Sequence, residues 1–216
     1  MVEYLTPEAI KLLLEQPDKY TPKGRRDLTL ISILYDSGAR VQELIDMKVC
    51  DVSLDGPAVL TLTGKGNKTR RVPIMKNTAS LLQSYLLENK LDKPWRNENP
   101  LFTNSQRRKL TKEGVTYILS KYVEAGRKLS TLLPLRVTNH MLRHSKAMHL
   151  LQGGVNLIYI RDFLGHVDLK TTEIYARADT EMKRKAIENV HPDLTDSDLP
   201  DWNKDQALLS WLSEIK

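Results

Sequence analysis

Apolar residues recur every three or four positions over most of this chain, which is the spacing of helices with one buried face. The first such stretch, residues 6–16, has Thr6 as a predicted helix N-cap and Pro7 at the first helical position. A second stretch, residues 25–38, carries a broad apolar face that stops at Gly38. The same pattern predicts further helices over residues 78–90, 111–126, 139–154, 156–165, 179–190 and 205–215.

One segment has β character instead. Residues 59–74 read VLTLTGKGNKTRRVPI, two short runs with β-branched residues around a turn of Gly and Asn, which predicts a β-hairpin. Pro73 cannot donate a hydrogen bond to a neighbouring strand, so we expect it at a sheet edge or near a strand end. The predicted fold class is therefore mainly α with a small antiparallel β-sheet.

The composition is that of a soluble globular protein. The chain has 216 residues, of which 40% are hydrophobic and 28% charged, and no apolar run approaches the ~18 residues of a membrane span. Without a secretory signal either, we expect it in the cytoplasm. The single cysteine, Cys50, excludes an intramolecular disulfide and a cysteine-based zinc cluster, and we expect it to be a small core residue.

The charge is unevenly distributed. The formal net charge is +6, but residues 193–216 carry six acidic residues and two lysines, which leaves +10 on residues 1–192. A basic body with an acidic tail indicates a polyanionic partner, and nucleic acid is favoured over a membrane because no basic amphipathic helix stands out. A basic protein that is merely soluble remains the alternative on charge alone.

The tail predicts a division of the chain into three parts. Residues 191–203, HPDLTDSDLPDWN, are rich in Pro and Asp and predict an acidic linker. Residues 204–216 then form a C-terminal docking helix, which packs either on its own domain (in cis) or on a neighbouring copy (in trans). Its apolar stripe consists of Leu208, Trp211, Leu212 and Ile215. Residues 1–190 are left as the main domain.

A histidine-rich segment, NHMLRHSKAMHLLQGG at residues 139–154, is the first candidate for chemistry. His140 and His144 have the helical spacing of a zinc pair, but Met141 stands where the zinc-protease pattern needs a glutamate, and Arg143 would repel a cation. An anion site is favoured, because the guanidinium of Arg143 offers a planar fork to two phosphate oxygens and His140 lies on nearly the same helix face. Two solvated helix residues are the alternative.

Other groups along the chain strengthen the anion-site hypothesis. Arg40 opens a helix just after Gly38, and a helix N-terminus favours anions. The hairpin turn gathers basic residues, but Lys65 is followed by Gly66 rather than Ser or Thr, so it is not a nucleotide-binding P-loop. Further along, His166 follows a helix stop and Tyr175 comes nine residues later.

The order of these groups is more specific than any one of them. Gly-x-Arg-x-x-Glu-Leu, a Gly-Lys-Gly hairpin, His-x-x-Arg-His, Leu-Gly-His and a tyrosine nine residues on resemble the catalytic domain of tyrosine recombinases of the phage-integrase and Xer type, over residues 1 to about 190. The resemblance implies Tyr175 as nucleophile, Lys65 as proton donor to the leaving oxygen, and a structural role for Glu43. The phosphate-binding residues it implies are Arg40, His140, Arg143 and His166.

The physical chemistry of strand transfer agrees with this set. Attack on a phosphodiester places extra negative charge on the non-bridging oxygens, and a site without a metal ion needs several fixed donors there. Since the pKa of a tyrosine is about 10, Tyr175 must lose its proton as it attacks, which a positive field or a histidine such as His140 would assist. The resulting 3′-phosphotyrosyl link conserves the bond energy, so we expect neither a metal ion nor any other cofactor.

The expected partner is double-stranded DNA. Basic side chains on the hairpin and in the QRRK cluster are candidates for phosphate contacts, namely Lys68, Arg70, Arg71, Arg107, Arg108 and Lys109. The resemblance further implies a tetramer on two DNA sites, a monomer or weak oligomer without DNA, association with the nucleoid, and a mobile-element role such as integration. It also implies a preceding DNA-binding domain, absent before residue 4, so we expect a truncated chain or a compact variant.

Two other functions remain open at this stage. A type IB topoisomerase would use similar residues to relax supercoiled DNA without exchanging strands, although the compact Gly-Lys-Gly and Leu-Gly-His spacings and the final helix favour a recombinase. A DNA-binding regulator on the same fold would need no intact catalytic set. Formation of a covalent DNA adduct would separate the enzymes from the regulator, and joining of two duplexes would separate the recombinase from the topoisomerase.

Overall fold

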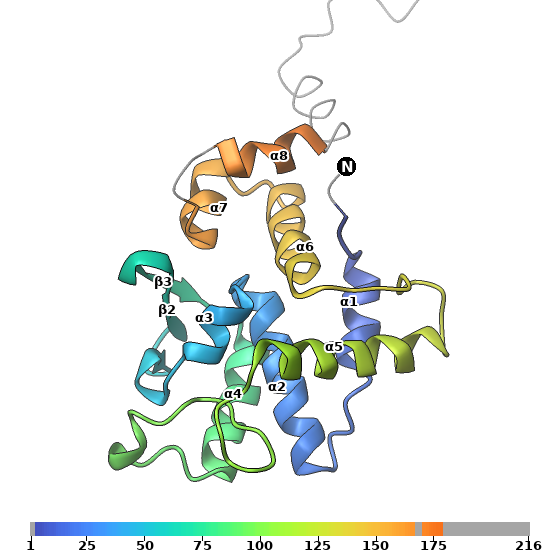
Figure 1. Ribbon diagram of the computed structural model, residues 1–216. Helices are drawn as coiled ribbons and strands as arrows, with labels where there is room; N and C mark the ends of the chain where they lie inside the picture. Colours follow the sequence, from blue (N-terminus) through green and yellow to red (C-terminus); the bar gives the residue numbers. More distant parts are fainter. Residues whose placement is uncertain (1–2, 167–169, 179–216) are drawn as a thin grey trace, which may run out of the picture. The chain divides into compact units, whose positions relative to one another are not determined.

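Helices dominate the computed structural model, which describes residues 3–166 and 170–178 (Figure 1). In chain order these helices are α1 (Pro7–Leu14), α2 (Pro22–Ser37), α3 (Val41–Asp46), α4 (Lys76–Glu88), α5 (Lys112–Arg127), α6 (Asn139–Gln152), α7 (Leu157–Leu164) and α8 (Lys170–Ala178). The strands are β1 (Val52–Ser53), β2 (Val59–Thr63) and β3 (Thr69–Pro73). The fold class predicted from the sequence is confirmed. The predicted helices at 179–190 and 205–215 and the linker at 191–203 lie outside the described residues.

The predicted helix boundaries are confirmed where the sequence carries a capping signal. The hydroxyl of Thr6 accepts a hydrogen bond from the backbone N–H of Ala9, and Pro7 is the first residue of α1. At the C-terminal end of α2, Gly38 adopts the left-handed backbone conformation with φ 56°, which residues other than glycine rarely adopt. This turn redirects the chain into α3 and so places Arg40 at the start of that helix.

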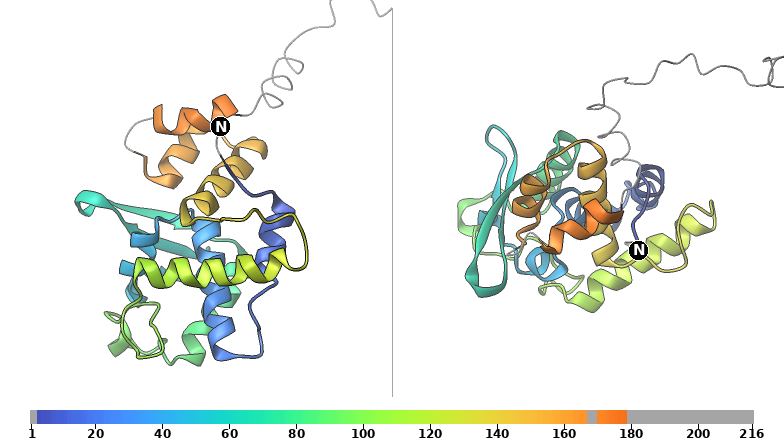
Figure 2. Two further views of the ribbon diagram at one scale, coloured as in Figure 1. Left: turned by 45° about the vertical axis from the view of Figure 1, so that its right-hand side comes forward. Right: turned by 90° about the horizontal axis from the view of Figure 1, so that it is seen from above.

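The sheet is antiparallel with strand order β1-β2-β3 and lies at one edge of the described domain, beside α3 (Figures 1 and 2). In the predicted hairpin, Leu60 pairs with Val72 and both side chains are fully buried. Pro73 is the last residue of β3, as its missing N–H requires. The hydrophobic pattern does not predict β1, because two residues are too few to show an alternation.

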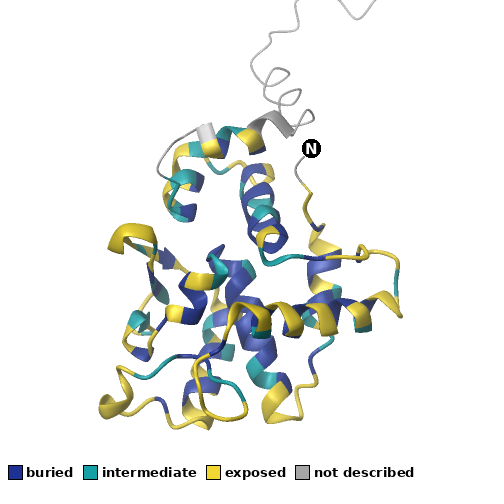
Figure 3. Ribbon diagram, viewed as in Figure 1, coloured by how far each residue is buried: buried dark blue, intermediate teal, exposed yellow. Residues whose placement is uncertain are grey.

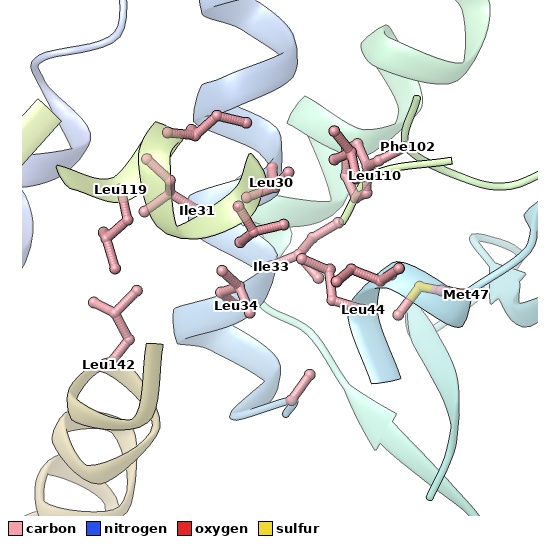
Figure 4. Packing of buried hydrophobic residues seen from close by; sticks show 14 of the residues in the cluster. Leu30, Ile31, Ile33, Leu34, Leu44, Met47, Phe102, Leu110, Leu119 and Leu142 are labelled. Carbon is pink, nitrogen blue, oxygen red and sulfur yellow. The ribbon is translucent and has the colours of Figure 1, made fainter. Parts of the chain in front are cut away.

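The hydrophobic core surrounds α2. Leu30, Ile31 and Ile33 are fully buried, and most of α2 is coloured as buried in Figure 3. Side chains from α3, α5, α6 and the segment around Phe102 pack against this helix (Figure 4). Burying such side chains stabilises the fold by about 1.5–3 kcal/mol each. Residues that bind the ends of α2 are therefore held by a rigid central element.

Two aspartates on α2 are buried and paired. Asp36 accepts a hydrogen bond from Lys146 on α6 at 2.8 Å and another from the backbone N–H of Met75 at 2.7 Å. Asp27 accepts a hydrogen bond from the hydroxyl of Tyr122 on α5. Because a buried carboxylate is stable only when paired, these contacts fix α2 against its neighbours.

The prediction that Cys50 is a small core residue is wrong. Its side chain is exposed, in a short 3-10 turn between α3 and β1, whereas its neighbour Val49 faces the core. The segment is too short for a hydrophobic period to indicate which residue points inward.

α6, α7 and α8 lie together at one end of the domain, and α7 packs against β3 (Figures 1 and 2). This arrangement brings together segments from the middle and the end of the described chain. Within the described residues, no helix is long and apolar enough to cross a membrane.

Candidate active site

Arg143 lies at the centre of the candidate site. α6 begins after Thr138, whose hydroxyl caps the helix at Met141, and this fixes Arg143 in the second turn. Its side chain is buried and donates one hydrogen bond to the carbonyl of Gly38 and one to the carbonyl of Leu164, both at 2.6 Å. Arg143 therefore ties the end of α2 to the end of α7.

The charge of Arg143 is held in an unusual environment. Burial, together with the positive charges of Arg40 and Arg70, lowers its pKa to about 10. The group nevertheless remains a cation at neutral pH. A buried cation with further cations around it is a site that an anion such as a phosphate would stabilise.

Arg40 is the outer arginine of the site. Its backbone N–H donates to one carboxylate oxygen of Glu43 at 2.7 Å, and its Nη1 donates to the other at 2.9 Å. The Arg40 side chain is 40% exposed, whereas that of Glu43 is only 3% exposed. Glu43 thus holds one edge of the guanidinium while the remainder faces solvent, where a ligand could reach it. This agrees with the structural role expected for Glu43.

Arg70 does not match the expectation of a surface phosphate contact. Both of its terminal nitrogens donate to Glu43 at 2.8 Å, and its Nε donates to the carbonyl of Phe163 at 3.0 Å. Gly165 makes this possible, because a Cβ there would lie 2.9 Å from the Arg70 side chain. All three guanidinium nitrogens of Arg70 therefore donate to protein groups, whereas Arg143 donates through two, which favours a supporting role for Arg70.

Tyr175, the predicted nucleophile, lies on α8 and is fully buried. Its hydroxyl is 2.8 Å from Nδ1 of His144 on α6. Burial raises the pKa of the phenol, and the positive charges of Arg143 and Arg40 act in the opposite direction. The positive charges of both arginines therefore favour the ionised form of the Tyr175 phenol.

His166 lies directly beyond the C-terminal end of α7 and beside the tyrosine. Its ring stacks on that of Tyr175, with centroids 6.5 Å apart and planes 12° apart, and its Nδ1 is 2.9 Å from the hydroxyl of Thr172. Burial and the charges of Arg143 and other arginines lower its pKa to about 4. His166 is therefore neutral at pH 7. If the Thr172 hydroxyl donates to Nδ1, the hydrogen of the ring is on Nε2, which can donate a hydrogen bond to a phosphate oxygen.

His140 and Lys65 lie further out than the other predicted catalytic residues. His140 is exposed, and its ring centroid is 6.5 Å from that of His144. Lys65 is exposed in the turn between β2 and β3, next to Gly66 with its left-handed φ of 74°. Within the described residues, no hydrogen bond joins either side chain to Tyr175. The structure thus groups Arg40, Arg143, His166 and Tyr175, with His140 at the rim and Lys65 on the hairpin.

The basic residues predicted to contact DNA fall in two places. Lys68 and Arg71 are exposed on the hairpin. The loop containing Arg107, Arg108 and Lys109 is also exposed, but it lies at the end of the domain away from α7 and α8 (Figures 1 and 2). Lys109 forms an exposed ion pair with Asp46 at the end of α3. All of these roles stay predictions.

Two contributors to the site, His144 and Thr172, are not predicted from the sequence. His144 was considered only as half of a zinc pair, and Thr172 was not considered, because a hydrogen bond between α6 and α8 or across a helix end leaves no periodic signal. In the described part of the chain, no three His, Cys, Asp or Glu residues gather as in a metal centre. The groups that do gather are cations and neutral rings around one tyrosine, an arrangement suited to a phosphate ester.

A mainly helical domain with this cluster defines the catalytic domain of a tyrosine recombinase. The family model described as "Phage integrase family" matches residues 3–182, and the chain belongs to that family. It is 40% identical over 186 residues to the tyrosine recombinase XerA of Thermococcus kodakarensis, covering 85% of this chain and 61% of that protein. It is 36% identical over 194 residues to the putative integrase/recombinase y4rC of Sinorhizobium fredii, covering 89% of this chain and 57% of that protein.

A solved structure shows the same fold. The site-specific recombinase XerH, in a post-cleavage complex with its palindromic difH substrate, superposes with a TM-score of 0.71 at 29% identity, covering 87% of this chain and 53% of that one. The chain thus spans less than two thirds of the length of the relatives described here.

Proposed function

We propose that this chain is the catalytic domain of a site-specific DNA recombinase or integrase that cleaves and rejoins DNA strands through Tyr175. The observation that carries the proposal is the position of Tyr175: its ring stacks on that of His166, and the nearby positive charges of Arg143 and Arg40 oppose the rise in its pKa that burial causes. The recombinase-DNA complex of the XerH relative supports DNA as the substrate.

In the proposed reaction the Tyr175 oxygen forms a bond to phosphorus and the bond from phosphorus to the 5′ oxygen breaks. Arg40, Arg143 and His166 would donate hydrogen bonds to the non-bridging oxygens, where negative charge develops. Lys65 would protonate the leaving 5′ oxygen, which requires the exposed hairpin turn to fold over the site. A second 5′ hydroxyl then attacks the 3′-phosphotyrosyl link and releases the tyrosine, so no net oxidation or hydrolysis occurs.

The test is capture of the covalent intermediate. The chain is incubated with a library of nicked duplexes of randomised sequence, in which cleavage near the nick releases a short fragment and prevents rejoining. We expect a protein-DNA adduct that survives denaturation and is lost in Tyr175→Phe, and sequencing of the trapped ends would reveal the preferred site. An adduct that persists in Tyr175→Phe would refute the assignment of the nucleophile.

Joining of strands from two different duplexes would distinguish recombination from relaxation of supercoiled DNA by a topoisomerase-like activity. If neither occurs but DNA is still bound, the chain is a regulator on the same fold. We further propose that it acts in the cytoplasm, at the nucleoid when bound, as a tetramer on two DNA sites. Light scattering with and without the captured site would then show a monomer or weak oligomer becoming a tetramer.

A further inference from the structure

Of the two histidines that flank Arg143 on α6, the described structure brings His144 to the tyrosine. Nδ1 of His144 is 2.8 Å from the hydroxyl of Tyr175, and the two ring centroids are 5.7 Å apart. His140 is exposed, and its ring lies 6.5 Å from that of His144. His144 is therefore the imidazole that contacts the reacting oxygen.

We propose that His144, rather than His140, accepts the proton of Tyr175 during attack on DNA, an inference that rests on the proposed function. As the bond from the phenol oxygen to phosphorus forms, the O–H bond breaks and its proton passes to Nδ1, giving an imidazolium. The bond to the 5′ oxygen breaks at the same phosphorus. In the rejoining step His144 returns the proton to the departing phenolate, so each cycle leaves the histidine unchanged.

The surroundings keep this imidazole ready to accept a proton. On α6 it neighbours His140 and Arg143; Tyr175 faces it from α8, and His166 approaches from beyond α7. Burial and the neighbouring positive charges lower the pKa of His144, so the ring is neutral at neutral pH and one nitrogen is free of hydrogen. A DNA phosphate would bring negative charge into the same cluster and offset the cations, which favours the imidazolium when the proton must be accepted.

The geometry meets the first requirement for a general base. The donor-acceptor distance lies within the roughly 2.6–3.2 Å that proton transfer needs. The hydrogen bond also fixes the phenol oxygen, so a purely positioning role must be distinguished from proton transfer. Asparagine makes that distinction, because its amide can hold the phenol by a hydrogen bond but cannot accept a proton.

The experiment measures the rate of adduct formation by the full chain on the nicked duplex that it cleaves. The variants are His144→Asn, His144→Ala, His140→Ala and Tyr175→Phe, with DNA affinity and thermal unfolding measured for each. We expect adduct formation by His144→Asn to slow about 100-fold or more, at unchanged DNA affinity, consistent with the contribution of a general base. Free imidazole should increase the rate of adduct formation by His144→Ala at least tenfold. It should not increase the rate of His140→Ala.

The outcomes separate this inference from the proposed function. If His144→Asn cleaves at the wild-type rate, or imidazole rescues His140→Ala instead, His144 is not the proton acceptor although Tyr175 can still be the nucleophile. If Tyr175→Phe retains the adduct, the proposed function itself fails. If His144→Ala does not fold, His144→Asn alone decides.

Discussion

Arg70 donates a hydrogen bond to Glu43 from each of its terminal guanidinium nitrogens, and each nitrogen is 2.8 Å from a different carboxylate oxygen. The same carboxylate receives two hydrogen bonds from Arg40, so a single buried acid orders two arginines from β3 and the start of α3. Paired forks of this kind fix geometry as well as charge. Glu43 is therefore the anchor of the cationic part of the site.

The first prediction concerns the pH dependence of stability through Glu43. Burial alone would raise its pKa, but the hydrogen bonds from Arg70 and Arg40 outweigh this effect and lower the pKa from 4.5 to about 2. A carboxyl with a lowered folded-state pKa stabilises the fold above the unfolded pKa of 4.5, and this contribution is lost as the pH falls toward 2. The contribution at neutral pH is about 3 kcal/mol.

Urea denaturation of the wild type and Glu43→Gln between pH 7 and pH 2 would measure this contribution. We expect the variant to be less stable at pH 7 and the difference to shrink as the pH falls from 4.5 toward 2. Glu124→Gln, at an exposed position on α5, is the control and should follow the wild-type curve. A Glu43→Gln difference that stays constant over this range would show that the carboxylate charge is not what stabilises the site.

The second prediction distinguishes Arg40 from Arg143, the two arginines proposed to bind the phosphate. Removing either should cost one or more charge-assisted hydrogen bonds of about 1.5–3 kcal/mol each, and hence about 10- to 150-fold or more in cleavage rate. Arg143→Ala should also lose more stability than Arg40→Ala, since it leaves the buried carbonyls of Gly38 and Leu164 without their donors, at about 1–3 kcal/mol each. Arg40→Ala removes one side-chain hydrogen bond to Glu43, which still accepts from Arg70 and from the backbone N–H of residue 40.

The measurement pairs adduct formation with urea denaturation for Arg40→Ala and Arg143→Ala. Arg136→Ala, at an exposed position before α6, is the control for both assays. Equal loss of stability in Arg40→Ala and Arg143→Ala would contradict the structural role assigned to the buried arginine.

Much of this arrangement can be predicted from the sequence, because its elements carry local signals. The caps at Thr6 and Gly38 and the turn in the hairpin fix where the chain bends, and the bends in turn place Arg40 and Arg143. The order of the motifs selects Arg40, Arg143, His166 and Tyr175, which the structure groups, but also Lys65 and His140, which lie further out.

The contacts within the site could not be predicted, because they depend on packing between distant segments. Arg70 looks like any other basic residue of the hairpin, and only the approach of α7 to β3 brings it to the carbonyl of Phe163. His144 likewise follows Arg143 in the sequence with no local signal of a partner. Only the position of α8 brings it to Tyr175. Side-chain partners more than 25 residues apart are set by tertiary structure, not by periodicity.

The third prediction concerns Thr172, which supports His166. Its buried hydroxyl lies 2.9 Å from Nδ1 of His166, so Thr172→Val should free the ring to change tautomer or rotate. A lost hydrogen bond of about 1 kcal/mol in the transition state would slow adduct formation several-fold, with DNA affinity unchanged. The neighbouring Thr171→Val, at an exposed position of the same helix, is the matched control. Identical rates for the two variants would rule out a role for the hydroxyl.

The last prediction separates basic residues that contact DNA from those that support the site. Each phosphate contact lowers the logarithm of affinity by about 0.9 per logarithmic unit of salt, so removing one contact should reduce the salt slope by about that amount. We expect this reduction for Lys68→Ala and Arg71→Ala, whose side chains are exposed on the hairpin. Arg70→Ala should instead leave the slope unchanged and destabilise the fold by about 1.5–3 kcal/mol, because the buried Glu43 loses one charged partner and keeps Arg40.

The same titration decides whether the loop of Arg107 and Arg108 contacts DNA. That loop lies away from α7 and α8, so its variants change the slope only if the DNA extends along the α3 side of the domain to reach it (Figure 1). Fluorescence anisotropy with a labelled duplex, at several salt concentrations, provides both the slope and the affinity. A smaller slope for Arg107→Ala would extend the DNA-binding surface to this end of the domain, whereas a smaller slope for Arg70→Ala would contradict the supporting role inferred from its contacts.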